Sequence, residues 1–207
     1  MKKVDGWTAT ASRWSESAKR LSFAHTSSTL HGSTFGSRTS TPGTLLTYRP
    51  SGQGTYRMDM TWVTDRIAVG GGIWRAENMS EVARMGVTHI IDMQIEFDDT
   101  ALAKPHGIHV FWNAVDDDFQ PKPPEVFQDA VAFGLKALED PNSKIFIHCA
   151  AGVHRAPMMT LALLRALGYE LKEAMHMIQS KRHVVDFADV YVKSVERFIQ
   201  QYEPAEL

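Results

Sequence analysis

One stretch of the sequence carries most of the structural information: Lys144-Ile145-Phe146-Ile147-His148-Cys149-Ala150-Ala151-Gly152-Val153-His154-Arg155. Its first part, Lys144–His148, is short and apolar, as expected of a buried strand. The segment Arg155–Leu167 is apolar on nearly all sides, which predicts a buried central helix. A strand, a loop and a helix in this order place Cys149 at the carboxyl edge of a sheet and Arg155 at the start of a helix.

The loop between this strand and this helix has the features of an anion site. Its backbone N–H groups can surround one anion at the helix N-terminus. Gly152 permits a tight backbone path, and the planar guanidinium of Arg155 can hold two phosphate oxygens. We therefore predict phosphate binding by Ala150, Ala151, Gly152, Val153, His154 and Arg155.

Cys149 is the only cysteine of the chain. A lone cysteine is usually a small buried hydrophobe. Thiols at helix N-termini or beside cations, however, ionise well below their usual range, so we expect a thiolate here. A thiolate beneath a bound phosphate can attack phosphorus, which makes Cys149 the predicted nucleophile. This chemistry requires no metal and no other cofactor.

Patterns of strands and helices alternate after residue 57. The predicted strands are Thr61–Val69, Val87–Ile91 and Ile108–Trp112, besides Lys144–His148. The predicted helices run from an N-cap at Ser80 to Met85, from Pro123 to Leu138, and over Arg155–Leu167, Leu171–Arg182 and Asp189–Tyr202. The alternation predicts one α/β domain over residues 58–207, with a mostly parallel central sheet flanked by helices.

Residues 1–57 have a different composition. Eighteen Ser and Thr residues lie between Thr8 and Thr47, without helical or strand periodicity. Such a segment buries too little apolar surface to offset the entropy of ordering, so we expect a disordered or flexible extension. A flexible arm or an upstream extension is favoured over an organelle transit peptide.

The charge of the chain limits its partners. Residues 1–57 hold eight Lys and Arg against two acids, and residues 58–207 hold 14 against 22. An acidic domain repels polyanions, so we expect no nucleic-acid partner. No apolar run reaches about 18 residues, so we expect no membrane-spanning helix. A single cysteine indicates a reducing compartment, which we take as cytoplasmic unless the extension directs the chain to an organelle.

A candidate acid lies upstream of the nucleophile. Asp116, Asp117 and Asp118 follow the predicted strand Ile108–Trp112 and so belong to the same sheet edge as Cys149. Cleavage of a phosphate ester needs a general acid for the leaving oxygen, which one of these carboxylates can supply. Acids ahead of a helix are also favoured by the helix dipole. The physical chemistry of the three residues does not choose among them.

From Thr61 to Tyr202 the chain resembles the dual-specificity branch of the protein tyrosine phosphatase superfamily. The matching segments are the signature His148–Arg155, Val63–Gly70 and Gly86–Asp92. The resemblance implies the fold of that family and a two-step reaction: Cys149 takes the phosphoryl group, and water then hydrolyses the phosphocysteine. The spacing of acid and nucleophile in the family implies Asp117 as the acid, with Asp116 and Asp118 as alternatives.

One position departs from the wider family. The residue after the arginine is commonly Ser or Thr, whose hydroxyl helps the cysteine to leave, whereas this chain has Ala156 followed by Pro157. The Arg-Ala-Pro sequence is similar to that of the plant glucan phosphatases and laforin. Those enzymes also have a basic run after the next helix, matched here by Ser180-Lys181-Arg182, although a solvated helix end explains this run equally well.

Three functions are therefore considered. A phosphoric monoester hydrolase acting on phosphoserine, phosphothreonine or phosphotyrosine in proteins is favoured, because no segment resembles the loop that deepens the pocket of tyrosine-specific enzymes. A glucan phosphatase is the alternative, and a phosphate-binding module without turnover is the second. The glucan alternative is supported by aromatic residues near the expected rim of the site, because sugars stack on aromatic rings. Packing in the core would also account for these aromatic residues, which are Trp74, Phe111, Trp112, Phe119, Phe187 and Tyr191.

Overall fold

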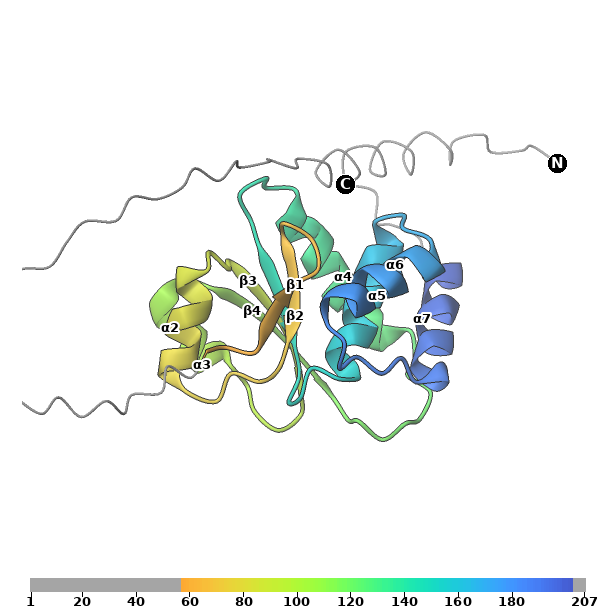
Figure 1. Cartoon of the computed structure of the whole chain (residues 1–207), viewed down its shortest axis with the longest axis horizontal. Coiled ribbons are helices and arrows are strands. Elements are labelled where there is room, and N and C mark those ends of the chain that lie inside the picture. Colours follow the sequence, from red (N-terminus) through yellow and green to blue (C-terminus); the bar gives the residue numbers. More distant parts are fainter. Residues whose placement is uncertain (1–56, 203–207) are drawn as a thin grey trace, which may run out of the picture.

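The computed structural model describes residues 57–202 and shows one sheet between two layers of helices (Figure 1). The five strands are ordered β1-β2-β5-β3-β4. The β1–β2 pair is antiparallel, while the β2–β5, β5–β3 and β3–β4 pairs are parallel, so the predicted α/β fold with a mostly parallel sheet is confirmed. The strands are β1 (Met60–Trp62), β2 (Ile67–Gly70), β3 (His89–Gln94), β4 (His109–Val115) and β5 (Ile145–His148).

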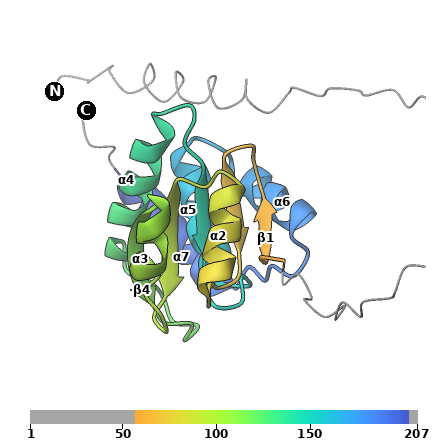
Figure 2. The same ribbon diagram turned by 90° about the vertical axis from the view of Figure 1, so that its left-hand side faces the viewer.

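The two faces of the sheet carry different helices (Figures 1 and 2). On one face lie α2 and α3, and on the other lie α4 to α7. A short 3₁₀ helix, η1, follows α3 directly. The helices are α2 (Ala76–Arg84), α3 (Thr100–Ala103), η1 (Lys104–His106), α4 (Glu125–Leu138), α5 (Arg155–Ala166), α6 (Leu171–Lys181) and α7 (Asp189–Gln201).

The centre of the fold is β5 and the helix that follows it. All four residues of β5 are buried, as expected of a strand with a parallel neighbour on each side. In α5 every residue from Arg155 to Leu164 is buried, which confirms the predicted central helix. The helix is enclosed by α4, α6, α7 and the sheet, and is therefore held rigidly at the edge where β5 ends.

The predicted single strand Thr61–Val69 is wrong, because this segment forms the hairpin of β1 and β2. The turn is stabilised by Thr64, whose Oγ1 accepts hydrogen bonds from the backbone N–H groups of Arg66 at 3.2 Å and Ile67 at 2.9 Å. Threonine side chains compete for backbone donors in this way and interrupt strands. The hairpin adds one antiparallel strand at the edge of the sheet.

The predicted N-cap at Ser80 is also wrong. Helix α2 begins one turn earlier, at Ala76, and Ser80 Oγ donates a 2.8 Å hydrogen bond to the carbonyl of Ala76 inside the helix. Met79 and Val82 are buried and lie on the side of the helix that faces the sheet. Their packing stabilises a helix that includes Ser80 and the turn before it. The sequence patterns did not indicate α3 and η1, which are too short to show a period.

Two expectations concern residues at the ends of the chain. The predicted extension, residues 1–57, lies outside the described residues except for Arg57, and residues 203–207 of the predicted domain lie outside them too. Among the helices of residues 57–202, none has both the length and the apolar character needed to cross a membrane.

We expect Leu163→Ala to lower the free energy of unfolding by about 2–5 kcal/mol, because it leaves a cavity between α5 and α4. Leu163 is fully buried and lies against Gly134, where an added β-carbon would be 3.0 Å from Leu163 Cδ1. Urea unfolding measures the change. The control Val184→Ala, at a side chain that is 59% exposed, should change stability by less than about 0.5 kcal/mol. Equal effects of the two substitutions would contradict this description of the core.

Candidate active site

The site lies where the parallel strands β2, β3, β4 and β5 end. Because carboxyl ends of parallel strands meet at one edge, the segments that follow these strands come together there. Cys149 follows β5, Glu96 follows β3 and Asp117 follows β4. Cys149 is 1% exposed and lies at the base of the loop that leads into α5.

Four consecutive carbonyl groups of this loop bond to partners outside it. The carbonyl of Ala150 accepts from the N–H of Gly72 at 3.1 Å, and that of Val153 accepts from the N–H of Asp186 at 3.1 Å. The carbonyls of Ala151 and Gly152 accept from the Arg182 guanidinium at 3.2 and 2.9 Å. Four consecutive carbonyls are thereby directed away from the centre of the loop.

This arrangement determines where the N–H groups point. In a planar trans peptide the C=O of one residue and the N–H of the next point in opposite directions, and the described chain has no cis peptide bond. With the carbonyls of residues 150–153 directed outward, the N–H groups of residues 151–154 face inward. One of them, the N–H of Gly152, donates to Cys149 Sγ at 3.3 Å. The loop can thus hold a tetrahedral anion directly over the sulfur.

Gly152 is required by this path. Its φ angle is +65°, a conformation that costs little for glycine and is strained for other residues. A β-carbon at this position would lie 2.5 Å from the carbonyl carbon of Gly70 and from Arg182 Nη2. The backbone of β2 cannot move aside for it, so the glycine expected from the sequence is needed on two grounds.

Arg182 holds two carbonyl groups of the loop. Its side chain is 6% exposed, and both Nη groups donate to the carboxylate of Asp59 at 2.7 Å while Nε and Nη2 hold the loop carbonyls. The interpretation of Ser180-Lys181-Arg182 as a solvated helix end is therefore wrong for Arg182. Ser180 and Lys181 are exposed as that interpretation expects.

Arg155 is held by a carboxylate that the sequence analysis missed. Its Nη1 and Nη2 donate to Glu96 Oε2 and Oε1 at 2.9 and 2.8 Å, and Nη1 also donates to the carbonyl of Val115 at 3.0 Å. Burial opposes the charge of Arg155, yet Glu96, Cys149 and Asp117 outweigh it and raise the arginine pKa. The hydrogen bond to Arg155 in turn lowers the pKa of Glu96. The guanidinium is therefore a permanent cation at the loop.

Asp117 is the carboxylate that lies beside the loop. Its Oδ2 is 3.0 Å from His154 Nδ1 and 3.9 Å from Arg155 Nε. Its Oδ1 accepts a 3.0 Å hydrogen bond from the Tyr191 hydroxyl. Burial, with a further contribution from Asp117, raises the pKa of Tyr191 to about 12, so Tyr191 remains a donor. The structure thus brings together Cys149, the predicted phosphate loop, Arg155 and Asp117.

The neighbouring acids have other surroundings. Asp118 forms an ion pair with Lys122, whose hydrogen bond lowers the pKa of the Asp118 carboxyl. Asp116 is exposed. Asp117, in contrast, lies against the loop through His154 Nδ1 and Arg155 Nε. The geometry therefore favours Asp117 as the carboxylate of the anion site.

The predicted rim aromatics divide into two groups. Phe119 is 50% exposed and packs against His154 and Tyr191, with ring centroids 4.9 and 5.8 Å away, so it forms one wall of the site. Trp74 is also exposed, and its ring centroid lies 6.5 Å from that of Phe97. Phe111 and Phe187 pack against the core, and Trp112 Nε1 donates to the carbonyl of Gln94 on the sheet.

These features agree with the comparison to protein families. Residues 74–201 match the model of the dual specificity phosphatase catalytic domain. The match covers more than half of the chain, and the chain therefore belongs to the dual specificity phosphatase family, as its sequence signature indicated.

Individual relatives resemble parts of the chain. Dual specificity protein phosphatase 5 of Rattus norvegicus is 28% identical over 116 residues, which are 56% of this chain and 29% of that protein. Protein tyrosine phosphatase type IVA 3 of Mus musculus is 31% identical over 107 residues, which are 50% of this chain and 60% of that protein. The chain thus spans less than two thirds of the length of either relative.

Solved structures share the fold at low identity. The crystal structure of Tk-PTP in the active form has a TM-score of 0.61 and 18% identity, covering 70% of this chain and 98% of that one. PTPMT1 in complex with PI(5)P has a TM-score of 0.62 and 17% identity, covering 69% of this chain and 96% of that one. These likenesses establish a protein tyrosine phosphatase fold for the chain.

We expect Arg182→Met to lower the free energy of unfolding by about 1–3 kcal/mol, because the carbonyls of Ala151 and Gly152 lose their donor. The loosened loop should also reduce turnover of para-nitrophenyl phosphate. Lys181→Met is the matched control, since Lys181 is the exposed neighbour of Arg182. Chemical denaturation and steady-state kinetics measure the two effects. Loss of the same size in both variants would show that the loop does not depend on Arg182.

Proposed function

We propose that this protein hydrolyses phosphoric monoesters through a phosphocysteine intermediate, with phosphorylated Ser, Thr or Tyr side chains of proteins as substrates. The observation that carries the proposal is the outward bonding of the carbonyls of residues 150–153, together with the donation from Gly152 N–H to Cys149 Sγ. These bonds direct the following N–H groups toward the sulfur, beside the Arg155 cation. An anion held there lies directly above a nucleophile. The family membership and the neighbouring Asp117 support the same reaction.

In the first step the loop N–H groups and Arg155 bind the phosphoryl oxygens. Cys149 attacks phosphorus as the bond to the leaving oxygen breaks, and Asp117 gives that oxygen a proton. Charge on the phosphoryl oxygens is stabilised by donors that are already in place, which is the largest contribution expected in such a site. Glu96 contributes by holding the guanidinium of Arg155 in one orientation.

In the second step a water molecule attacks the phosphocysteine, and the carboxylate of Asp117 accepts its proton. The sulfur then leaves as a thiolate, helped by the N–H of Gly152 that already donates to it. At position 156 the alanine is fully buried and has no hydroxyl to assist this departure. We infer that breakdown of the intermediate is slow relative to its formation.

The wall formed by Phe119 supports a peptide substrate. An exposed ring beside the loop can pack against the chain next to a phosphorylated residue. The basic run does not decide between the glucan alternative and a peptide substrate, because Arg182 is engaged with Asp59 and with the loop itself. The phosphate-binding module remains an outcome of the first experiment below.

We expect wild-type protein to release phosphate from para-nitrophenyl phosphate and from phosphotyrosine and phosphoserine peptides in the presence of EDTA. Cys149→Ser should release none, because serine is not ionised at neutral pH and cannot replace the thiolate. Phosphate is measured directly, and solubilised phosphorylated starch is included as a substrate.

The outcomes of this experiment distinguish the three candidate functions. Release from starch in preference to peptides would favour a glucan phosphatase. No release from any substrate by folded wild-type protein would favour a binding module, and activity that persists in Cys149→Ser would overturn the cysteine mechanism.

We expect Asp117→Asn to reduce activity on a phosphoserine peptide far more than on para-nitrophenyl phosphate. The alkoxide of serine needs a proton in order to leave, whereas para-nitrophenolate does not, and general acids contribute roughly 10²–10⁴-fold. The ratio of kcat/KM for the two substrates is the readout, since unfolding would reduce both equally. Asp116→Asn and Asp118→Asn are the matched controls. A larger change of the ratio in either control would assign the acid to that residue instead.

A further inference from the structure

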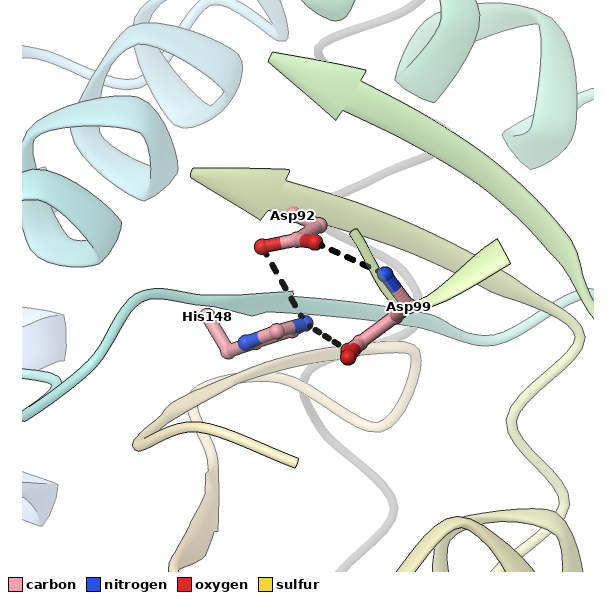
Figure 3. Close-up of side chains that lie close together, drawn as sticks. All are labelled: Asp92, Asp99 and His148. Atoms are coloured by element: carbon pink, nitrogen blue, oxygen red, sulfur yellow. Dashed lines mark hydrogen bonds and ion pairs between the residues drawn. The ribbon is translucent and has the colours of Figure 1, made fainter. Parts of the chain in front are cut away.

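A cluster of three polar side chains lies behind the nucleophile, on the opposite face of the sheet from α5. It consists of Asp92 on β3, His148 at the end of β5 and Asp99, which precedes α3 (Figure 3). Asp92 and His148 are partners in the parallel pairing of β3 with β5. Neither the proposed reaction nor the phosphate loop uses these side chains.

The three groups are close together and inaccessible to solvent. The relative exposure of each residue is 0%. His148 Nε2 lies 2.9 Å from Asp99 Oδ2 and 3.8 Å from Asp92 Oδ1, as the dashed lines of Figure 3 indicate. One ligand atom from each residue lies within 4.8 Å of the others. The carboxylates and the imidazole point toward a common centre.

The cluster is poorly satisfied by the protein itself. Asp92 accepts from the N–H groups of Gln94 at 2.9 Å and Asp99 at 3.3 Å. The contact between His148 Nε2 and Asp99 has the length of an ion pair but not the alignment of a hydrogen bond. Within residues 57–202, both oxygens of Asp99 and both nitrogens of His148 are buried without a hydrogen-bond partner. Buried polar atoms in this state are rare and require an explanation.

The charge of the two carboxylates also has to be neutralised. Two carboxylates in a site without solvent carry two negative charges that burial penalises heavily unless they are neutralised. Burial raises the pKa of the Asp92 carboxyl to about 6, although His148 opposes this shift. Neutrality needs two positive charges, which either one divalent cation or two protons can provide.

We propose that Asp92, Asp99 and His148 bind one divalent transition-metal cation, with Zn²⁺ as the representative probe. Imidazole nitrogen together with carboxylate oxygen is a donor set typical of such ions. Bonds of about 2.0–2.1 Å at tetrahedral angles place neighbouring ligand atoms about 3.3 Å apart. The separations of 2.9 and 3.8 Å at His148 Nε2 lie on either side of this value.

The cation would have a structural role. It would join β3, β5 and the start of α3 at the point where the chain turns into the phosphate loop, since His148 immediately precedes Cys149. Sites of this kind form as the protein folds, because the ligands are assembled only in the folded chain. The expectation that catalysis needs no metal is unaffected, since the cluster faces away from the substrate side of the loop.

The test uses the full chain carrying Cys149→Ser, which removes the one thiol that could bind zinc elsewhere. The protein is produced with Zn²⁺ in the medium and passed over a chelating resin, and its zinc content is then measured by mass spectrometry. We expect one zinc per chain and a higher melting temperature than that of protein produced without zinc. Asp99→Asn in the same background should hold roughly tenfold less zinc, because it removes an anionic ligand.

Asp98→Asn is the matched control: the same chemical change at the adjacent, exposed residue should leave the zinc content unchanged. Absence of zinc from the parent protein, or equal zinc in both asparagine variants, would overturn the proposal and favour a cluster neutralised by protons. If Asp99→Asn does not fold, Co²⁺ loaded into the parent protein decides. Intense visible absorption of a tetrahedral nitrogen and oxygen site supports the proposal, and a weak octahedral spectrum overturns it.

Discussion

The structure depends on the outward direction of four consecutive carbonyl groups in the loop after β5. The four carbonyls bond to three parts of the chain: that of Ala150 to Gly72 after β2, two to Arg182 after α6, and that of Val153 to Asp186 ahead of α7. Because a peptide is planar, these bonds turn the following N–H groups toward Cys149. The site is therefore made by the tertiary structure as a whole, since the loop has no internal ladder that could hold the same path.

The charges around the loop follow from the same constraint. Inward N–H groups and the Arg155 cation create a positive centre within a domain whose net charge is negative. Glu96 and Asp117 keep the guanidinium in place from two sides, with Glu96 making the bidentate contact and Asp117 lying 3.9 Å from Nε. A fixed guanidinium needs no reorganisation when an anion binds, which is the advantage of a preorganised site.

Much of this could be predicted from local sequence. The apolar strand, the glycine-containing loop and the largely apolar helix are contiguous, and the identities of Cys149, Gly152 and Arg155 restrict the geometry strongly. The roles of Glu96 and Arg182 could not be predicted, because Glu96 is 59 residues from Arg155 and Arg182 is 123 from Asp59. The hairpin at Thr64 and the early start of α2 were missed because side-chain bonds and tertiary packing overrode the local patterns.

The residues at the end of β5 contribute side chains to both faces of the sheet. Side chains alternate along a strand, so Ile145, Ile147 and Cys149 belong to the core beneath α5, while Phe146 belongs to the core beneath α2. His148 therefore points to the side of α2 and α3, where Asp92 and Asp99 surround it. Because His148 and Cys149 are consecutive, the packing of that buried cluster also restrains the backbone that carries the proposed nucleophile. We therefore expect the position of Cys149 to depend on both faces of the sheet.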